Sequence, residues 1–399
     1  MFPEELMHDE IARRALRELA SWLREDAYPV WSQQGWDNQH GGFHERLSAN
    51  GPLVCDLRRA RVQLRQIYAF ARAPSFGWTG DMRRLVADGI AQVTGRYMRP
   101  DGLVRVLVAP DGTVADNRAL LYDQAFALLA FAAAQRVLGP DSRLRQSATA
   151  LVDRIQSVYK RSGPGFRSES TRERPLSSNP HMHLLEAALA WRRESDDYRW
   201  SRLLEDLVTL ALEHLIDPHT GALREHVEVA DTDYTAVQGR LVEPGHQFEW
   251  AWLLLRASVE GTTLMRRDSA RKVHTRLLAA ARRLVEVGES YGVHDQVVIN
   301  AILDDMTVHD PEARLWPQTE RLKAHALMAR LTGEPHHWRL AGEAAQTLER
   351  YLDTGARGLW YDRRRSDGSF VAEASPASSF YHIVCAIGEL ASALETTLA

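Results

Sequence analysis

Apolar residues recur at the spacing of helix faces along nearly the whole chain. Counting these runs predicts about twelve helices. Their expected ranges are 9–27, 58–73, 79–97, 117–137, 142–159, 181–194, 198–216, 244–261, 268–287, 314–333, 337–353 and 377–396. Short breaks such as LGPDSR and SFGWTG join many of them into pairs, which is typical of helical hairpins.

The longer gaps between helices share a different pattern. GGFHERLSANG, GLVRVLVAPDG, GALREHVEV and GLWYDRRRSDGSF each begin with glycine and carry aromatic or β-branched residues. They are predicted to be short β-hairpin excursions. The unit of a helix pair and a β-like loop recurs about every 60 residues without a Pro/Ser-rich linker. We therefore expect residues 1–399 to form a single catalytic domain.

Alternate helices begin with polar residues and then become apolar. These openings are RVQLRQIYAF, LLYDQAFALL, HMHLLEAAL, EPGHQFEWAWLL, RLWPQTERLKA and SSFYHIVCAI. The helices between them, such as 142–159 and 268–287, show scattered arginines over an apolar stripe, as solvated helices do. If the two kinds form an inner and an outer ring, the polar openings meet at one mouth. This predicts an all-α fold, an (α/α)6 barrel of six hairpins, with a polar pocket suited to a small sugar.

Composition narrows the classes of partner. The net charge of −4 with 26% charged residues implies no basic face for nucleic acid or an anionic membrane. The N-terminal stretch lacks the apolar core of a signal peptide, and no apolar run reaches membrane-spanning length. Cys55 and Cys385 are too few for a disulfide framework. We expect a cytoplasmic protein, monomeric or homodimeric, without nucleic-acid or membrane partners.

Two histidines, His181 and His183, open one inner helix two residues apart. Positions i and i+2 face different sides of a helix, so the two cannot serve one ligand and one is expected to be spare. His183 precedes Glu186 by three residues, and the same HxxE spacing returns in His246 and Glu249. A carboxylate one turn away fixes a histidine's tautomer and raises its basicity, which favours His183 as the functional one.

Other polar residues leave more than one interpretation open. His382 begins the last inner helix without a nearby acid, so its partner has to come from another helix. Arg65 is a charge on an apolar face, for which a structural ion pair and a functional role are equally compatible. Glu320 and Lys323 have the spacing of an i,i+3 surface pair. A di-iron site is disfavoured because such motifs run ExxH, the reverse of the order here.

Six motifs in order closely resemble the N-acylglucosamine 2-epimerase superfamily, which also contains D-mannose isomerase, cellobiose 2-epimerase and sulfoquinovose isomerase. They are RVQLRQIYAFARA, LYDQAFALLAFA, SNPHMHLLEA, VEPGHQFEWAWLLL, RLWPQTERLKA and SSFYHI. The resemblance runs from about residue 41 to residue 383 and implies the (α/α)6 barrel. GHQFEWAWLL and RLWPQTE look most like the mannose isomerase branch.

The resemblance also implies roles for particular residues. The family's catalytic histidines match His183, His246 and His382, its essential arginine matches Arg65, and Glu249 is expected to orient His246. The positions expected to contact the sugar or support the histidines are Tyr122, Asn179, Glu186, Trp316 and Gln318. Histidine can take a proton from C2 of an open-chain sugar and return it near neutral pH. The expected chemistry therefore uses no metal and no cofactor.

Three functions are compatible with these residues. The first is isomerisation of a free monosaccharide, D-mannose to D-fructose or D-lyxose to D-xylulose, through a cis-enediol. The second is 2-epimerisation of N-acyl-D-glucosamine, of mannose or glucose, or of a cellobiose-type disaccharide. A remote third is an (α/α)6 glycoside hydrolase, which needs two carboxylates facing each other across a bond. The histidine-rich pocket counts against hydrolysis.

Overall fold

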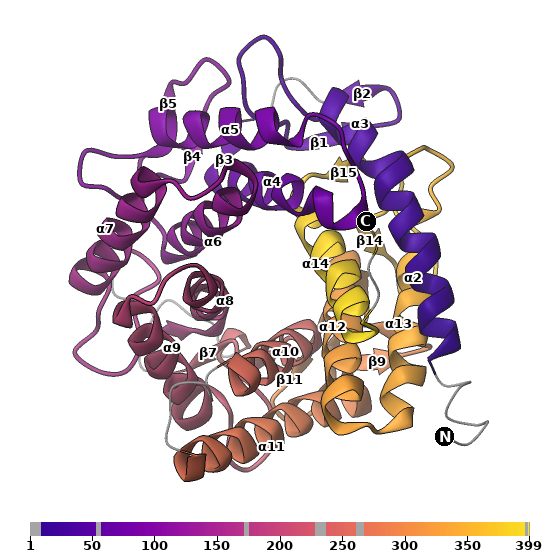
Figure 1. The fold of residues 1–399 in the computed structure, drawn as a ribbon. Helices are drawn as coiled ribbons and strands as arrows, with labels where there is room; N and C mark the ends of the chain where they lie inside the picture. Colours follow the sequence, from indigo (N-terminus) through magenta and orange to yellow (C-terminus); the bar gives the residue numbers. More distant parts are fainter. Residues whose placement is uncertain are drawn as a thin grey trace.

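The computed structural model describes residues 9–52, 57–170, 175–227, 237–260, 267–395 and 398. Within these ranges the helices form two concentric rings (Figure 1). The inner ring contains α4 (Ala60–Arg72), α6 (Leu121–Leu138), α8 (Ser178–Glu194), α10 (Pro244–Glu260), α12 (Leu315–Thr332) and α14 (Ser378–Ala393). The outer ring contains α2 (Glu10–Trp22), α5 (Met82–Gln92), α7 (Ser142–Val158), α9 (Tyr198–Leu210), α11 (Arg267–Gly292) and α13 (Pro335–Leu352).

Short segments extend several of these helices. The helix α2 continues through a π-turn, η1 (Leu23–Ala27), into α3 (Tyr28–Gln33), and π-turns η3 (Val93–Tyr97) and η4 (Ala211–Leu215) end α5 and α9. Two 3-10 turns are η2 (Ala73–Phe76) and η5 (Gln238–Arg240). Most helix ends lie within four residues of the predicted ones; α11 continues to Gly292, five residues beyond its predicted end.

The inner ring closes on itself. Each inner helix packs against the next, and α14 packs against α4, while α13 of the outer ring packs against α2. Both ends of the chain thus take part in closure (Figure 1). The predicted (α/α)6 toroid is confirmed. No helix in the described ranges is long and apolar enough to span a membrane.

Burial explains which helices lie inside. In α6 every residue from Leu121 to Gln135 except Tyr122 is buried, so the helix has no solvated face. In α7 the buried residues are Leu144, Ala148, Leu151, Val152 and Ile155, which form one stripe at helical spacing. An inner helix has neighbours on all sides and must be apolar all round, whereas an outer helix needs only one apolar stripe.

The strands all lie in connections that lead from an outer helix to the next inner helix. In the three-stranded sheets, β1 (Arg46–Ser48) lies between β2 (Gly51–Pro52) and β15 (Ser375–Pro376), β4 (Leu107–Val108) lies between β3 (Arg58–Arg59) and β5 (Val114–Asp116), and β11 (Ala301–Leu303) lies between β8 (Leu241–Val242) and β12 (Val308–Asp310). The two-stranded sheets pair β6 (Leu176–Ser177) with β7 (His226–Val227), β9 (Val293–His294) with β10 (Val297–Val298), and β13 (Ala313–Arg314) with β14 (Arg363–Arg364). All pairs are antiparallel.

The four predicted β-excursions contain strands or isolated bridges, although residues 228 and 229 of one lie outside the described ranges, as does Cys55. Ten strands of the described chain lie outside the predicted β-excursions, namely β3, β5, β6, β8 to β13 and β15, and β3 lies where helix 58–73 was predicted to begin. Each has only two or three residues, and β11 pairs with the distant β8. Strands this short produce no alternating run that a sequence can show.

A repeated side-chain clamp fastens each loop to its inner helix. In four repeats a glutamine accepts from the backbone N–H and donates to the backbone C=O of one loop residue, at 2.7–2.9 Å. The pairs are Gln63 with Phe43, Gln124 with Val104, Gln247 with Leu223 and Gln318 with Val298. In the last repeat the two bonds to Trp360 come from the hydroxyl of Ser375, which lies in β15 just before α14 and not on the inner helix itself.

His181 occupies the clamp position of the remaining repeat. Its Nε2 accepts from the Phe166 N–H at 2.8 Å, and its Nδ1 lies 2.6 Å from the Ser177 carbonyl oxygen. This confirms that one of the two neighbouring histidines is structural. Gln318, expected to contact the sugar or support the histidines, belongs to the same set: both ends of its side-chain amide are hydrogen-bonded to backbone, which is a structural role.

Candidate active site

The first turns of the inner helices surround a cavity of about 270 Å3. Eight of the ten site residues expected from the sequence line it: Arg65, Tyr122, Asn179, His183, His246, Glu249, Trp316 and His382. Glu186 lies behind His183, and Gln318 lies outside the lining. The polar openings of the inner helices therefore do meet at one mouth.

His382 of α14 receives its partner from another helix, as expected. Its Nδ1 lies 2.9 Å from Oε1 of Glu320 on α12. Donation from Nδ1 to this carboxylate leaves Nε2 as the acceptor. Burial lowers the pKa of His382 well below its usual value, and the nearby cations Arg65 and Lys323 lower it further. The imidazole is thus neutral near pH 7 and able to accept a proton.

His246 of α10 has the opposite charge state. Its Nδ1 lies 2.9 Å from Oε2 of Glu225 and 3.7 Å from Oε2 of Glu243. Burial alone lowers the pKa of His246, but these two carboxylates outweigh it and raise the pKa to about 10. Glu225 is itself held by the Ser178 hydroxyl at 2.9 Å. The expectation that Glu249 orients His246 is corrected: the loop residue Glu225 does so.

His183 of α8 is paired as its HxxE spacing predicts. Its Nδ1 lies 3.4 Å from Oε2 of Glu186, which also accepts from the Tyr381 hydroxyl. The ring packs edge-on against Tyr122, with centroids 5.0 Å apart. Burial lowers the pKa of His183 to about 4. Glu249, the acid expected beside His246, lies 4.0 Å from His183 Nδ1 instead.

Arg65 brings a cation into the cavity without a matching carboxylate among the described residues. It donates to the Tyr122 hydroxyl at 2.5 Å and to the Ser378 carbonyl at 3.3 Å. Its guanidinium lies 4.4 Å from the centroid of the Phe126 ring. A buried arginine that lacks a counterion is stabilised by any negative charge that develops beside it. The geometry therefore suits a functional rather than a structural role.

Lys323 and Glu320 form a buried ion pair beneath His382. Both side chains are 0% exposed, and Nζ lies 2.5 Å from Glu320 Oε2. Nζ also lies 3.8 Å from the centroid of the Trp252 ring. The sequence-based expectation of a surface pair was wrong, because α12 is an inner helix and has no solvated face in this turn. Glu249, buried near the pair, has its pKa raised to about 8 by burial and by Glu320.

Three groups of side chains around the cavity have their potential ligand atoms close enough to hold a metal ion. They are His183 with Glu186 and Glu249; His246 with Glu225 and Glu243; and His382 with Glu249 and Glu320. Carboxylates and imidazoles suit a divalent transition metal. In each group, however, a carboxylate already pairs with the histidine Nδ1 or lies within 4.0 Å of it.

Several cavity residues were missed from the sequence. Glu243, Arg314, Asp362 and Ser379 line the cavity, and Glu225 supports it from a loop. The position of Glu243 immediately before the PGH motif was a usable signal. Ser379 lies in the polar opening SSFYHI of α14, which was also a usable signal. Arg314, Asp362 and Glu225 lie in or beside the short strands, whose position against the inner helices depends on pairing that only the fold determines.

Comparison with known proteins agrees with this architecture. The family model described as N-acylglucosamine 2-epimerase (GlcNAc 2-epimerase) matches residues 41–386. A "Mannose-6-phosphate isomerase" of Rhizobium meliloti (strain 1021) is 42% identical over 393 residues, covering 95% of this chain and 97% of that protein. The crystal structure of a D-mannose isomerase has a TM-score of 0.80 at 18% identity, covering 98% of this chain and all of that one.

The structure of cellobiose 2-epimerase from Spirochaeta thermophila has a TM-score of 0.81 at 21% identity and covers 97% of this chain and 98% of its own. At these identities the two solved structures speak for the fold alone. The family model and the Rhizobium relative each extend over most of the sequence. The chain therefore belongs to the N-acylglucosamine 2-epimerase family, whose members isomerise or epimerise sugars.

Proposed function

We propose that the protein is an aldose–ketose isomerase that converts D-mannose to D-fructose, with residues 1–399 acting as one catalytic domain. The observation that carries this proposal is a pair of histidines of opposite charge state in one cavity. The rings of neutral His382 and protonated His246 both pack against Trp316, with centroids 5.9 Å and 4.9 Å from it, and both line the cavity. A base and an acid are thus both ready beside a bound sugar.

The proton transfers follow from these charge states. His246 as an imidazolium donates its proton to the ring oxygen, and the neutral imidazole then takes the proton of the C1 hydroxyl, so that the ring opens and C1 becomes the carbonyl. Nε2 of His382 then takes the proton from C2, and the C–H electron pair forms an enediolate whose charge lies on the former carbonyl oxygen. Arg65 stabilises that charge. His246 then donates its proton to the charged C1 oxygen and takes the proton of the C2 hydroxyl. As C2 becomes the carbonyl, His382 returns the same proton to C1, which gives the ketose.

The size and charges of the cavity support a monosaccharide and a metal-free reaction. Its volume of about 270 Å3 lies just below the range of about 300–1,000 Å3 for ligand sites, which favours a small substrate. Arg65 and the His246 imidazolium supply the polarisation that a metal ion would otherwise provide. We also propose a cytoplasmic location, which the two-cysteine composition favours.

A second candidate, 2-epimerisation, is favoured by the placement of the two histidines. His246 and His382 both pack on Trp316 and line the cavity, so a bound sugar has two acid–base groups beside it that can deliver a proton. Return of a proton to the opposite face of C2 gives the epimer instead of the ketose. The two reactions differ only in where one proton is delivered.

Proton NMR in D2O with excess EDTA separates these reactions. We expect D-mannose and D-fructose to interconvert, with deuterium appearing at C1 or C2. N-Acetyl-D-mannosamine, D-glucose, D-lyxose and D-mannose 6-phosphate are incubated in parallel. A change of configuration at C2 without formation of any ketose would show that the protein is a 2-epimerase and not an isomerase. Loss of activity in EDTA that is restored by a divalent metal would contradict the metal-free reaction.

The charge states of the two histidines predict the pH dependence of kcat/KM. His382 stays neutral well below pH 6.5, and His246 stays protonated up to about pH 10. We therefore expect a plateau from about pH 6 to 9 and a fall above it as His246 loses its proton. The alkaline fall should disappear from the residual activity of His246→Gln. A rate that rises steadily from pH 7 to 10 would assign His246 as the base.

A further inference from the structure

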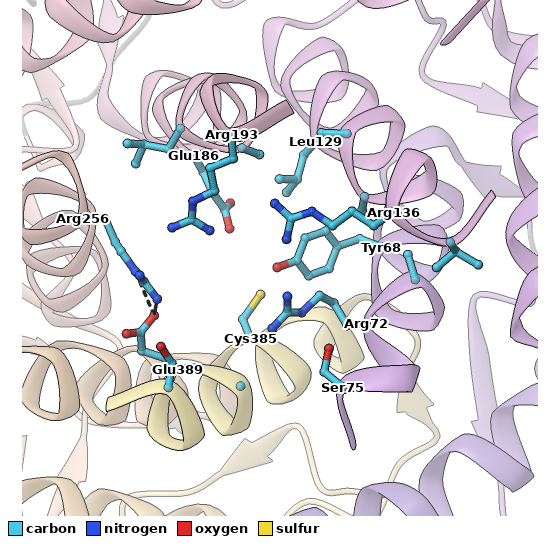
Figure 2. Close-up of a pocket in the computed structure, with 18 of the residues that line it drawn as sticks. Tyr68, Arg72, Ser75, Leu129, Arg136, Glu186, Arg193, Arg256, Cys385 and Glu389 are labelled. Atoms are coloured by element: carbon cyan, nitrogen blue, oxygen red, sulfur yellow. Dashed lines mark hydrogen bonds and ion pairs between the residues drawn. The ribbon is translucent and has the colours of Figure 1, made fainter. Parts of the chain in front are cut away.

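A second cavity opens at the other end of the inner ring. It has a volume of about 740 Å3 and is lined by the C-terminal halves of inner helices, from Ala71 and Arg72 of α4 round to Glu389 and Ser392 of α14 (Figure 2). The first cavity is lined by the starts of the same helices. The two cavities therefore lie at opposite ends of the toroid.

Arginine dominates the charged lining of this second cavity. Five arginines and three glutamates contribute to it. Arg256 pairs with Glu389, Arg193 pairs with Glu260, and Arg136 pairs with Glu194 outside the lining at 2.7 Å. Figure 2 shows the guanidinium groups of Arg136 and Arg193 directed into the opening. Ion pairing thus accounts for three of the five cations.

Arg72 is not accounted for in this way. Its side chain makes no hydrogen bond or ion pair with any residue that the structure describes, and its Nε is buried. It projects into the opening beside Tyr68 and Cys385 (Figure 2), with one Nη against the surface of Gly388, where an added Cβ would lie 3.1 Å away. Arg83 bonds only to the backbone carbonyls of Val137 and Leu138. Two guanidinium groups of the lining thus have no carboxylate partner in the described chain.

The partial charge at the helix ends does not by itself account for the unpartnered arginines of the second cavity. The C-terminal end of a helix carries partial negative charge, and an arginine in its last turn offsets that charge. Arg72 and Arg136 both lie in such turns. This effect needs no ligand, and the buried Nε of Arg72 cannot be reached by one. The Nη end of Arg72 projects into the opening without a partner among the described residues (Figure 2), and a guanidinium forms paired hydrogen bonds with phosphate and carboxylate.

The rest of the wall indicates the kind of molecule. Leu129, Leu189, Leu253 and Trp252 form an apolar side, and the volume lies within the range of sites for small metabolites. We propose that the second cavity binds a small phosphorylated metabolite, with its phosphate on Arg72 and its body against the apolar side. Glu186, which supports His183, forms part of the same lining. The bound metabolite would therefore contact the Glu186 side chain from the side opposite His183.

Calorimetric titration with inorganic pyrophosphate in 150 mM salt tests the site without any assay of catalysis. We expect saturable binding to the wild type and at least a tenfold weaker affinity in Arg72→Gln. Arg314→Gln, which removes an arginine from the mouth of the first cavity, is the matched control and should bind as the wild type does. Thermal melts of both variants confirm that they are folded.

Three results would overturn the proposal: no binding to the folded wild type, equal affinity in Arg72→Gln, or loss of binding in Arg314→Gln, which would place the anion at the first cavity. Citrate is titrated as the carboxylate probe. If citrate binds through Arg72 and pyrophosphate does not, the assignment of a phosphate is wrong. None of these results depends on which sugar the protein converts.

Discussion

His382→Asn is expected to lower kcat by about 10²–10⁴-fold, the usual contribution of a general acid–base group. The asparagine side-chain NH2 can replace Nδ1 as the donor to Glu320, which in the wild type lies 2.9 Å from Nδ1. What the substitution removes is Nε2, the atom proposed to take the C2 proton. Exchange of the C2 hydrogen of mannose into D2O should fall in parallel with kcat, while the melting temperature changes little.

His181→Gln is the control for this result. Glutamine is the residue that clamps the loop in four other repeats, so it can replace the His181 clamp. We therefore expect near-normal kcat and stability. Both variants remove one buried histidine from the inner ring, but only one removes a group that faces the cavity. If His382→Asn retained more than about a tenth of the wild-type kcat, His382 would not be the base.

Lys323→Met is expected to destabilise the fold by about 3–5 kcal/mol, because it leaves the fully buried Glu320 without its cation. Methionine has a similar length and fits the apolar contact with Trp252. Denaturant unfolding at pH 8 measures the loss. Lys160→Met is the matched control, since the Lys160 side chain is 41% exposed and pairs with Asp206 at 3.5 Å; its effect should be below about 1 kcal/mol.

The loss should depend on pH in a definite direction. In the wild type the pKa of Lys323 is raised above its usual 10.5, so its stabilising contribution is complete below that pH and is lost only above it. In the variant, burial raises the pKa of Glu320 with no cation to oppose it. A raised carboxyl pKa destabilises the fold at higher pH and ceases to do so once the group is protonated.

We therefore expect a smaller difference between wild type and Lys323→Met at pH 5.5 than at pH 8. Adding Glu320→Gln to the variant removes the uncompensated charge and should restore most of the stability at pH 8. A difference that stayed constant with pH would show that lost packing, rather than the charge of Glu320, causes the destabilisation.

The sequence predicts the ring of helices well because burial acts on every turn. An inner helix such as α6 shows apolar residues all round, and an outer one such as α7 shows a single stripe. This contrast identified both rings and the common mouth. The polar first turns then led to the three histidines, which are separated by 63 residues or more along the chain but line one cavity.

What the sequence did not predict are contacts made between elements. Glu225, not Glu249, pairs with His246, because the clamp between Gln247 and Leu223 holds that loop against the start of α10. The HxxE spacing alone pointed to the wrong acid. Gln318 was assigned to the sugar pocket from the family resemblance, but it belongs to the loop clamp. A polar residue in the first turn of an inner helix can serve either the cavity or the clamp, and these two roles differ only in the direction of the side chain.

The closure of the inner ring has a consequence for the making of the protein. α14 comes after every other ring helix in sequence, seals the gap between α12 and α4, and carries His382. A nascent chain emerging from the ribosome therefore holds five inner helices with an open apolar seam until this last helix is synthesised. Turnover would begin only when α14 docks between α12 and α4 and brings His382 into the cavity.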